Sequence, residues 1–281
     1  MDRTIECFYP GSSFPSLSVT GASCALDCKH CSRRYLSGMV PVPEPEDLLS
    51  VAEALARRGA KGFLLSGGLD SAGRVPLSRH VDAIREIKSS TDLQVNAHIG
   101  LAMKEDISAL VDAGVDAFSV DVYGSDETIS EVLGLRARVG DYLEVVRSLR
   151  DAGASNVTPH ICVGIHRGEL RGEMAALERL RAAEPGQIVI ISLIPTRGTP
   201  YEGVPAPGRE DLLQVVRAAR SLHPDARLML GCMRLKKDRS WEAEAVEAGV
   251  DGIVLPSEST IGILEERGYS IRKRSVCCAI R

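Results

Sequence analysis

A unit of one apolar strand followed by one helix recurs along these 281 residues. The strand segments are short and rich in Val, Ile and Leu, which is typical of parallel sheets buried on both faces. We expect eight strands, at Leu17–Thr20, Gly62–Ser66, Leu93–Ala97, Ala117–Asp121, Val157–Val163, Ile188–Leu193, Arg227–Leu230 and Gly252–Leu255. Several helices between them are followed by a glycine, as at Gly59, Gly114 and Gly249, which fits the position after a helix end.

Eight such units predict an α/β protein with a (β/α)8 barrel of TIM type, and the chain length lies near the ~250 residues typical of that fold. An open doubly wound sheet is the alternative, but no segment marks a reversal of the strand order. We expect residues 1–281 to form a single domain. The N-terminal segment 1–16 and the C-terminal tail 268–281 are expected to cover the barrel mouth, where the carboxyl ends of the strands collect the chemistry of such barrels.

Three cysteines, Cys24, Cys28 and Cys31, lie in one short loop directly after the first expected strand. A [4Fe–4S] cluster usually takes four cysteines, so three would leave one iron open to bind and activate a small molecule. Zinc is the alternative, but it usually takes CxxC pairs with two further ligands. His30 lies between the last two cysteines and is poorly placed to complete a tetrahedron. The spacing therefore favours an iron–sulfur cluster with a chemical role.

The other five cysteines are Cys7, Cys162, Cys232, Cys277 and Cys278. If both termini fold over the barrel mouth, Cys7, Cys232 and one or both tail cysteines would hold a second iron–sulfur cluster. Cys162 competes with them as a ligand. The alternative is that these are apolar cysteines of the core, which are common.

Further polar residues and glycines follow the expected strands at the end where barrel enzymes place their sites. Alternation along a strand puts His160 and Cys162 on one face, toward either the lumen or the helix layer. Any one of these groups could instead satisfy only the backbone, and His166 could be a solvated loop residue. No carboxylate–histidine pair can be assigned without geometry. The candidates at the strand ends are Gly67, Gly68, Asn96, His98, Asp121 and His160.

The net charge of −4 argues against bulk binding to nucleic acid. No apolar run approaches the ~20 residues of a membrane span, and the first residues lack the apolar core of a signal peptide. A cytoplasmic location is therefore expected, where cysteines serve metal or redox chemistry more often than disulfides.

Basic residues gather after the fifth to seventh strands, and guanidinium groups there would suit carboxylates or an acidic partner surface. The alternative is ordinary charged loops. The residues are Arg167, Arg171, Arg197, Arg234, Lys236, Lys237 and Arg239.

The cysteine loop resembles that of the radical S-adenosylmethionine (radical SAM) enzymes. The resemblance implies that the open iron chelates the amino and carboxylate groups of S-adenosylmethionine, and that one-electron reduction yields a 5′-deoxyadenosyl radical. An electron donor such as ferredoxin or flavodoxin would supply the electron. Gly67 and Gly68 match the glycine pair beside the methionyl amino group, and His30 stands where many members have an aromatic residue against the adenine. The expected cofactor site also includes Asn96, His98, Asp121 and His160.

Further segments are similar to the two-protein lipoyl synthases, whose full-barrel architecture is similar to that of biotin synthase. These segments are Phe8–Gly11, Pro15–Gly21, Tyr35–Met39, Pro159–Ile161, Ile194–Pro200 and Gly231–Arg234. The resemblance implies sulfur insertion into an octanoyl chain on a lipoyl carrier protein, with a second cluster as the sulfur source and a second radical SAM subunit as partner. The alternatives are a biotin-synthase-like or hydrogenase-maturation-like enzyme that acts on a free small molecule, and a zinc-stabilised barrel that serves as a binding module.

Overall fold

The computed structural model describes residues 3–236 and 239–281. One eleven-stranded sheet organises the described chain, in the order β11-β1-β10-β9-β8-β7-β6-β5-β4-β2-β3. The paired neighbours are all parallel. The strands are β1 Arg3–Phe8, β2 Ser16–Ser18, β3 Val40–Pro41, β4 Gly62–Ser66, β5 Gln94–His98, β6 Ala117–Asp121, β7 Val157–Val163, β8 Gln187–Ser192, β9 Arg227–Leu230, β10 Gly252–Val254 and β11 Tyr269–Arg274.

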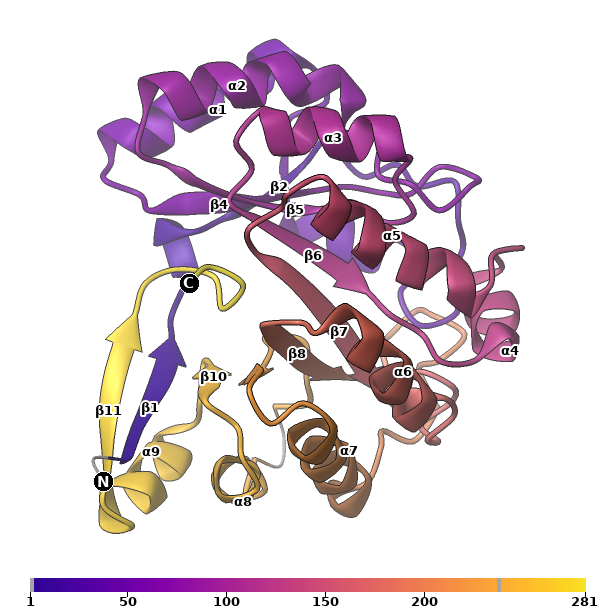
Figure 1. Cartoon of the computed structure of the whole chain (residues 1–281), viewed down its shortest axis with the longest axis vertical. Helices are drawn as coiled ribbons and strands as arrows, with labels where there is room; N and C mark the ends of the chain where they lie inside the picture. The colour runs from indigo at the N-terminus through magenta and orange to yellow at the C-terminus, as the bar shows by residue number, and fades with distance from the viewer. Residues whose placement is uncertain (1–2, 237–238) are drawn as a thin grey trace.

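Helices cover the convex, outer face of this curled sheet (Figure 1). The α-helices are α1 Pro45–Arg57, α2 Val81–Ser90, α3 Lys104–Asp112, α4 Asp126–Thr128, α5 Val139–Asp151, α6 Glu173–Leu180, α7 Arg209–Leu222, α8 Glu242–Glu247 and α9 Glu258–Glu266. Short turns of other helix types are η1 Gly11–Ser13, η2 Arg34–Gly38, η3 Ser78–His80, η4 Ile129–Leu133 and η5 Arg181–Ala183, of which η4 is a π-helix.

The predicted fold class is confirmed, because the eight expected strands are present as β2 and β4–β10 and alternate with helices. They are neighbours in chain order, so no reversal of strand order occurs. The ring is an open curl rather than a complete barrel: among the described residues, β3 and β11 are the two ends of the sheet.

Both chain ends add strands that the sequence pattern did not reveal. β1 pairs with β10 on one side and β11 on the other, with Cys7 beside Ile253 and Ile5 beside Ile271. Within the segments expected to cover the mouth, Arg3–Phe8 and Tyr269–Arg274 are therefore strands of the sheet and not a cover, while residues 1 and 2 lie outside the described residues. β11 carries exposed Arg and Lys side chains, which protect a sheet edge from further pairing.

The last residues turn back from β11 into the concave side of the curl (Figure 1). Gln187 Nε2 donates to the carbonyl of Cys278 at 2.8 Å, and Asn156 Nδ2 donates to the carbonyl of Ala279. Ala279 and Ile280 are buried against Phe14. The tail thus fills the interior of the sheet instead of covering its mouth.

No helix in the described ranges is both long and apolar enough to cross a membrane.

Candidate metal and cofactor site

The loop that carries Cys24, Cys28 and Cys31 is held between two neighbouring segments. Cys24 Sγ accepts a hydrogen bond from the Leu69 N–H at 3.2 Å, directly after β4. On the other side, Cys28 Sγ donates to the carbonyl of Leu133 at 3.7 Å, at the end of η4. Backbone bonds from Ala25 to Leu69 and from Lys29 to Val132 reinforce both attachments. The loop conformation is therefore determined by contacts far away in the sequence.

The thiols of this loop shift one another's pKa values. The side-chain interaction with Cys28 lowers the Cys31 pKa to about 7, so this sulfur readily becomes a thiolate. The same interaction raises the pKa of Cys28, to which burial and the charges of Cys31 and Cys24 add. Thiolates are the metal-binding form of cysteine. This donor set of three sulfurs fits a [4Fe–4S] cluster with one iron left open.

His30 lies between Cys28 and Cys31 in the same loop. Its Nδ1 is buried and has no hydrogen-bond partner. Burial lowers the His30 pKa to about 4, and the charge that opposes this shift is that of Asp121. The ring is therefore neutral near pH 7, and the nearby charge that acts on it is that of Asp121. An unsatisfied buried nitrogen is the feature expected where a ligand completes the site.

The two glycines after β4 pack under the cysteine loop. A Cβ at Gly68 would lie 2.0 Å from the Ser23 carbonyl oxygen and 2.6 Å from the Cys24 Cβ. The Gly68 N–H already donates to Thr20 Oγ1 at 2.6 Å. At Gly68 the absence of a side chain therefore serves close packing against the cysteine loop. At Gly67 a Cβ would lie 3.1 Å from Thr20 Oγ1.

Polar side chains from β5, β6 and β7 meet on the concave face. His98 Nε2 lies 3.2 Å from Asp121 Oδ2, and the rings of His98 and His160 are 6.2 Å apart. Below them, Ser119 Oγ donates to Asn96 Oδ1 at 3.0 Å. The structure thus brings together four of the predicted site residues and reveals the carboxylate–histidine pair that sequence alone did not. The signal available in the sequence was their shared position near the ends of adjacent strands.

Asp121 and His98 favour their charged forms, whereas His160 favours its neutral form. Burial opposes the ionised form of Asp121, but the neighbouring His98 outweighs it and lowers the Asp121 pKa. Burial likewise opposes protonation of His98, and Asp121 outweighs it and raises the His98 pKa. Burial lowers the pKa of His160 to about 4. Its Nδ1 donates to the Thr158 carbonyl at 3.0 Å, which leaves Nε2 with its lone pair. The site therefore combines an ion pair with a neutral imidazole.

A second group of three thiols lies on the same face. The interaction with the neighbouring Cys278 side chain lowers the Cys277 pKa to about 7. Burial and then the charge of Cys277 raise the pKa of Cys232, which extends from the end of β9. Asn96 Nδ2 donates to Cys277 Sγ at 3.5 Å and connects this group to the polar cluster. Three of the four cysteines predicted for a second cluster, Cys232, Cys277 and Cys278, thus lie near enough for their charges to interact.

Cys7 does not join them. It is fully buried in the core that also contains Ile5, whereas the next residue, Phe8, packs with Cys278 inside the curl. Alternate residues of a strand face opposite sides, so Cys7 points toward the helix layer. Burial, followed by the charge of Glu242 on α8, raises its pKa to about 11. The prediction of Cys7 as a cluster ligand is therefore wrong.

Cys162 is also separate from the tail cysteines. It shares a strand face with His160, and that face is the concave one. Burial raises its pKa, and the acidic groups that act on it are Asp121 and Glu173. Cys162 thus lies with the polar side chains of β5, β6 and β7 and not with the tail cysteines.

Fewer cations face solvent than the sequence suggested. Arg234 is buried and donates to Glu242 Oε1 at 2.7 and 3.0 Å, and Arg239 pairs with the same carboxylate at 3.1 Å. Arg171 pairs with Glu127. The expected basic residues that are exposed are Arg167, Arg171, Arg197 and Lys236, while Lys237 lies outside the described residues.

A surface hollow of about 810 Å³ lies at the amino ends of the strands, where Arg3, Arg227 and Asp251 line it. It lies at the opposite end of the sheet from the cysteine loop and contains none of the predicted site residues.

Comparisons with known proteins agree with this geometry. A family model described as the radical SAM superfamily matches residues 18–193. Biotin synthase from Burkholderia thailandensis is 28% identical over 249 residues, which cover 84% of this chain and 71% of that protein. A biotin synthase from Burkholderia mallei is 27% identical over the same length.

Solved structures show the same fold. HydG, a maturase of the [FeFe]-hydrogenase, superposes with a TM-score of 0.68 at 18% identity, over 96% of this chain and 64% of HydG. This chain therefore spans less than two thirds of the HydG chain. Methylornithine synthase, PylB, superposes with a TM-score of 0.65 at 15% identity, over 98% of this chain and 84% of that one.

Proposed function

Because the chain belongs to the radical SAM superfamily, we propose that it is a sulfur-inserting enzyme of the lipoyl synthase type. Members of the superfamily use a [4Fe–4S] cluster, S-adenosylmethionine and an electron donor. The observation that carries the finer proposal is the second group of thiols, Cys232, Cys277 and Cys278. Three further thiols on the concave face would supply ligands for a second cluster.

Cys24, Cys28 and Cys31 would hold the first cluster. When bound, this cluster supplies the electron that cleaves S-adenosylmethionine to a 5′-deoxyadenosyl radical. The protein positions the loop through Leu69 and Leu133, whose backbone groups bond two of the thiols. The concave face of the sheet would shield one side of the site from water, which closed active sites keep away from reactive species.

The remaining predicted residues would bind the nucleoside and the substrate. The unpartnered Nδ1 of the neutral His30 offers a hydrogen bond to the cofactor. Asp121 and His98 hold each other in a charged pair whose outer atoms can bond polar ligand groups. Gly67 and Gly68 lie beside the cysteine loop, and the proposed ligand space is completed by Asn96 and His160.

Cys232, Cys277 and Cys278 would hold the second cluster, which would serve as the sulfur source. Similarity to biotin synthase over 84% of the chain supports this role, because that enzyme is also a sulfurtransferase. The lowered pKa of Cys277, caused first by the interaction with the Cys278 side chain, favours a metal-binding thiolate.

The proposed substrate is an octanoyl chain on a lipoyl carrier protein, with a second radical SAM subunit completing the reaction and ferredoxin or flavodoxin as electron donor. Support comes from the lipoyl-synthase-like segments of the sequence and from the exposed Arg167, Arg197 and Lys236, which suit an acidic carrier.

A second candidate is an enzyme that acts on a free small molecule, as biotin synthase does. The internal pairing of Arg234 and Arg239 favours it, since it removes two cations from the surface offered to a carrier protein.

Iron and sulfide per chain, measured after anaerobic reconstitution, test the cluster assignment. We expect about eight irons in the wild type and about four both in Cys24→Ala/Cys28→Ala/Cys31→Ala and in Cys232→Ala/Cys277→Ala/Cys278→Ala. Cys7→Ala is the matched control and should keep all of them. About four irons in the wild type would overturn the second cluster, and zinc without sulfide would restore the binding-module alternative.

Incubation of the reconstituted enzyme with reductant and S-adenosylmethionine distinguishes the substrates. The octanoylated carrier protein should gain sulfur by mass spectrometry, and addition of the partner subunit should complete two insertions. Sulfur insertion into a free small acid such as dethiobiotin, with none into the carrier, would select the second candidate.

A further inference from the structure

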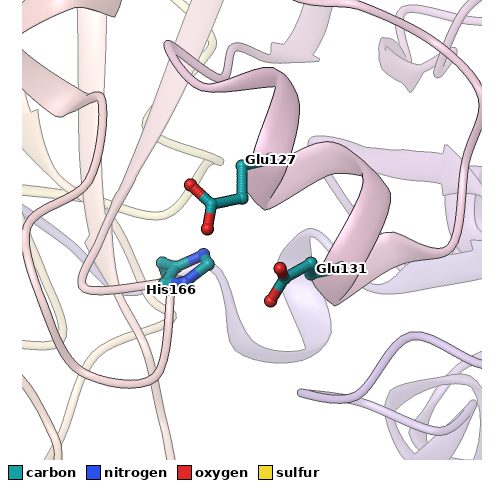
Figure 2. Close-up of side chains that lie close together, drawn as sticks. All are labelled: Glu127, Glu131 and His166. Atoms are coloured by element: carbon teal, nitrogen blue, oxygen red, sulfur yellow. The ribbon is translucent and has the colours of Figure 1, made fainter.

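Two glutamates and a histidine that belong to neither cysteine site meet at the rim of the active face. Glu127 belongs to α4, Glu131 to η4, and His166 to the loop after β7. One ligand atom from each lies within 4.8 Å of the others. Figure 2 shows the glutamates along one helical segment, with the imidazole facing them from the other loop.

The local structure places both carboxylates on one side. Residues four apart on a helix are neighbours, and like charges at this spacing destabilise it. Here the helix changes from α to π between Glu127 and Glu131. Such π-turns often occur at functional sites. The Glu131 side chain makes no hydrogen bond or ion pair with the part of the chain that the structure describes. A cation between the carboxylates would relieve their repulsion.

His166 is only 5% exposed and is oriented by Thr128. Its Nδ1 lies 3.2 Å from Thr128 Oγ1, and this hydroxyl donates at 3.5 Å to the carbonyl of Arg171. The hydroxyl proton is therefore used, so the imidazole donates through Nδ1 and keeps the lone pair on Nε2. No residue in the described ranges bonds that second nitrogen. A histidine held through one nitrogen in this way is typical of metal ligands.

One positive charge already competes for the cluster. Arg171 forms an ion pair with Glu127, and both side chains are about half exposed, with relative exposures of 41% and 50%. This pairing neutralises one carboxylate and leaves Glu131 and His166 without a cation. Exposed ion pairs are weak, so an arriving metal ion can displace the guanidinium.

We propose that Glu127, Glu131 and His166 form a site for a hard divalent cation of the Mn²⁺ class, separate from the cysteine sites. Two carboxylates and an imidazole suit such an ion, whereas thiols select softer metals. The bound ion would join the segment after β6 to the loop after β7. It would also stiffen η4, whose Leu133 carbonyl bonds Cys28. The proposal does not depend on the identity of the substrate.

Titration of the reconstituted, oxidised protein with Mn²⁺ tests the proposal, with the electron paramagnetic resonance signal of free Mn²⁺ as the readout. We expect one bound Mn²⁺ per chain and at least about tenfold weaker binding in Glu131→Gln and in His166→Gln. Glu169→Gln is the matched control. It removes the same charge as Glu131→Gln, from the loop that carries His166, but Glu169 is not one of the three proposed ligands. It should bind like the wild type.

Arg171→Gln should change Mn²⁺ affinity in the direction opposite to Glu131→Gln and His166→Gln. If Arg171 competes with the metal for Glu127, its removal should tighten Mn²⁺ binding several-fold. The Cys24→Ala/Cys28→Ala/Cys31→Ala variant should still bind one Mn²⁺, which separates this site from the cysteines. No stoichiometric binding by the wild type, or unchanged binding in Glu131→Gln, would overturn the proposal and leave only a surface ion pair.

Discussion

Arg234 shows how a residue's role depends on its partners. It follows Cys232 by two positions, where the sequence suggested a cation on the active face. Instead it is 1% exposed and bonds Glu242, which is fully buried. The second oxygen of Glu242 accepts from Ser257 and Thr260. A buried charge needs such complete pairing, so this residue fixes the loop that carries Cys232.

Glu242→Gln tests this pairing. The change leaves the buried guanidinium of Arg234 without its counter-charge, and breaking a buried ion pair in this way costs about 3–5 kcal/mol. Chemical denaturation should show the loss as a lower free energy of unfolding. Glu258→Gln, a neighbouring exposed acid, should change stability by no more than about 0.5 kcal/mol. Equal effects of the two variants would contradict the assignment.

The ion pair between His98 and Asp121 predicts a pH-dependent contribution to stability. The His98 pKa is raised above its ordinary 6.5, so its contribution is complete below that value and is lost as pH rises through the raised pKa. The Asp121 pKa is lowered below 3.8, so its contribution is present above 3.8 and is lost as pH falls through the lowered pKa.

Asp121→Asn should therefore lower the melting temperature most between the two ordinary values, roughly pH 4 to 6.5. The difference from the wild type should shrink as pH rises past the His98 pKa. Melting curves at a series of pH values measure this, and Asp225→Asn serves as a control away from the site. A difference that grows toward pH 9 would contradict the charged pair.

At the scale of elements, the cysteine loop is positioned by contacts on two sides. The turn after β4 reaches it through Gly68 and Leu69, and η4 reaches it through Leu133. A loop generally needs such tertiary contacts to hold ligands in one geometry. The glycine at position 68 is required because the loop backbone occupies the space of a side chain.

Gly68→Ala should displace the loop, because the added Cβ would lie 2.0 Å from the Ser23 carbonyl. We expect the first cluster to be lost, with iron after reconstitution falling by about four per chain. Gly38→Ala is the control, since nothing lies within 4 Å of its Cβ position. Full iron content in Gly68→Ala would show that the loop tolerates the shift.

At the scale of the molecule, the C-terminal tail fills the concave side of the open sheet. Ile280 is 3% exposed, and Ala279 beside it is fully buried. Gln187 and Asn156, at the amino ends of β8 and β7, bond the tail backbone. The same segment carries Cys277 and Cys278 to the concave face. Core formation and the proposed second cluster are therefore coupled through the tail.

Ile280→Ala should destabilise the protein by about 2–5 kcal/mol, as expected for truncation of a buried aliphatic side chain. Val40→Ala is the control, because Val40 is 41% exposed and its methyl groups contribute little. Urea unfolding of both variants gives the comparison. A loss below about 0.5 kcal/mol for Ile280→Ala would mean that the tail is not part of the core.

The sequence by itself determined the eight central strands, their helices, and the grouping of Cys24, Cys28 and Cys31, because periodicity and short spacing depend on neighbours along the chain. Only the tertiary structure decided the rest: the strands at both ends, the tail inside the curl, the exclusion of Cys7, and the pairing of His98 with Asp121. Those outcomes depend on which strand face or which distant partner a side chain meets. Long-range packing sets both, and no local pattern encodes it.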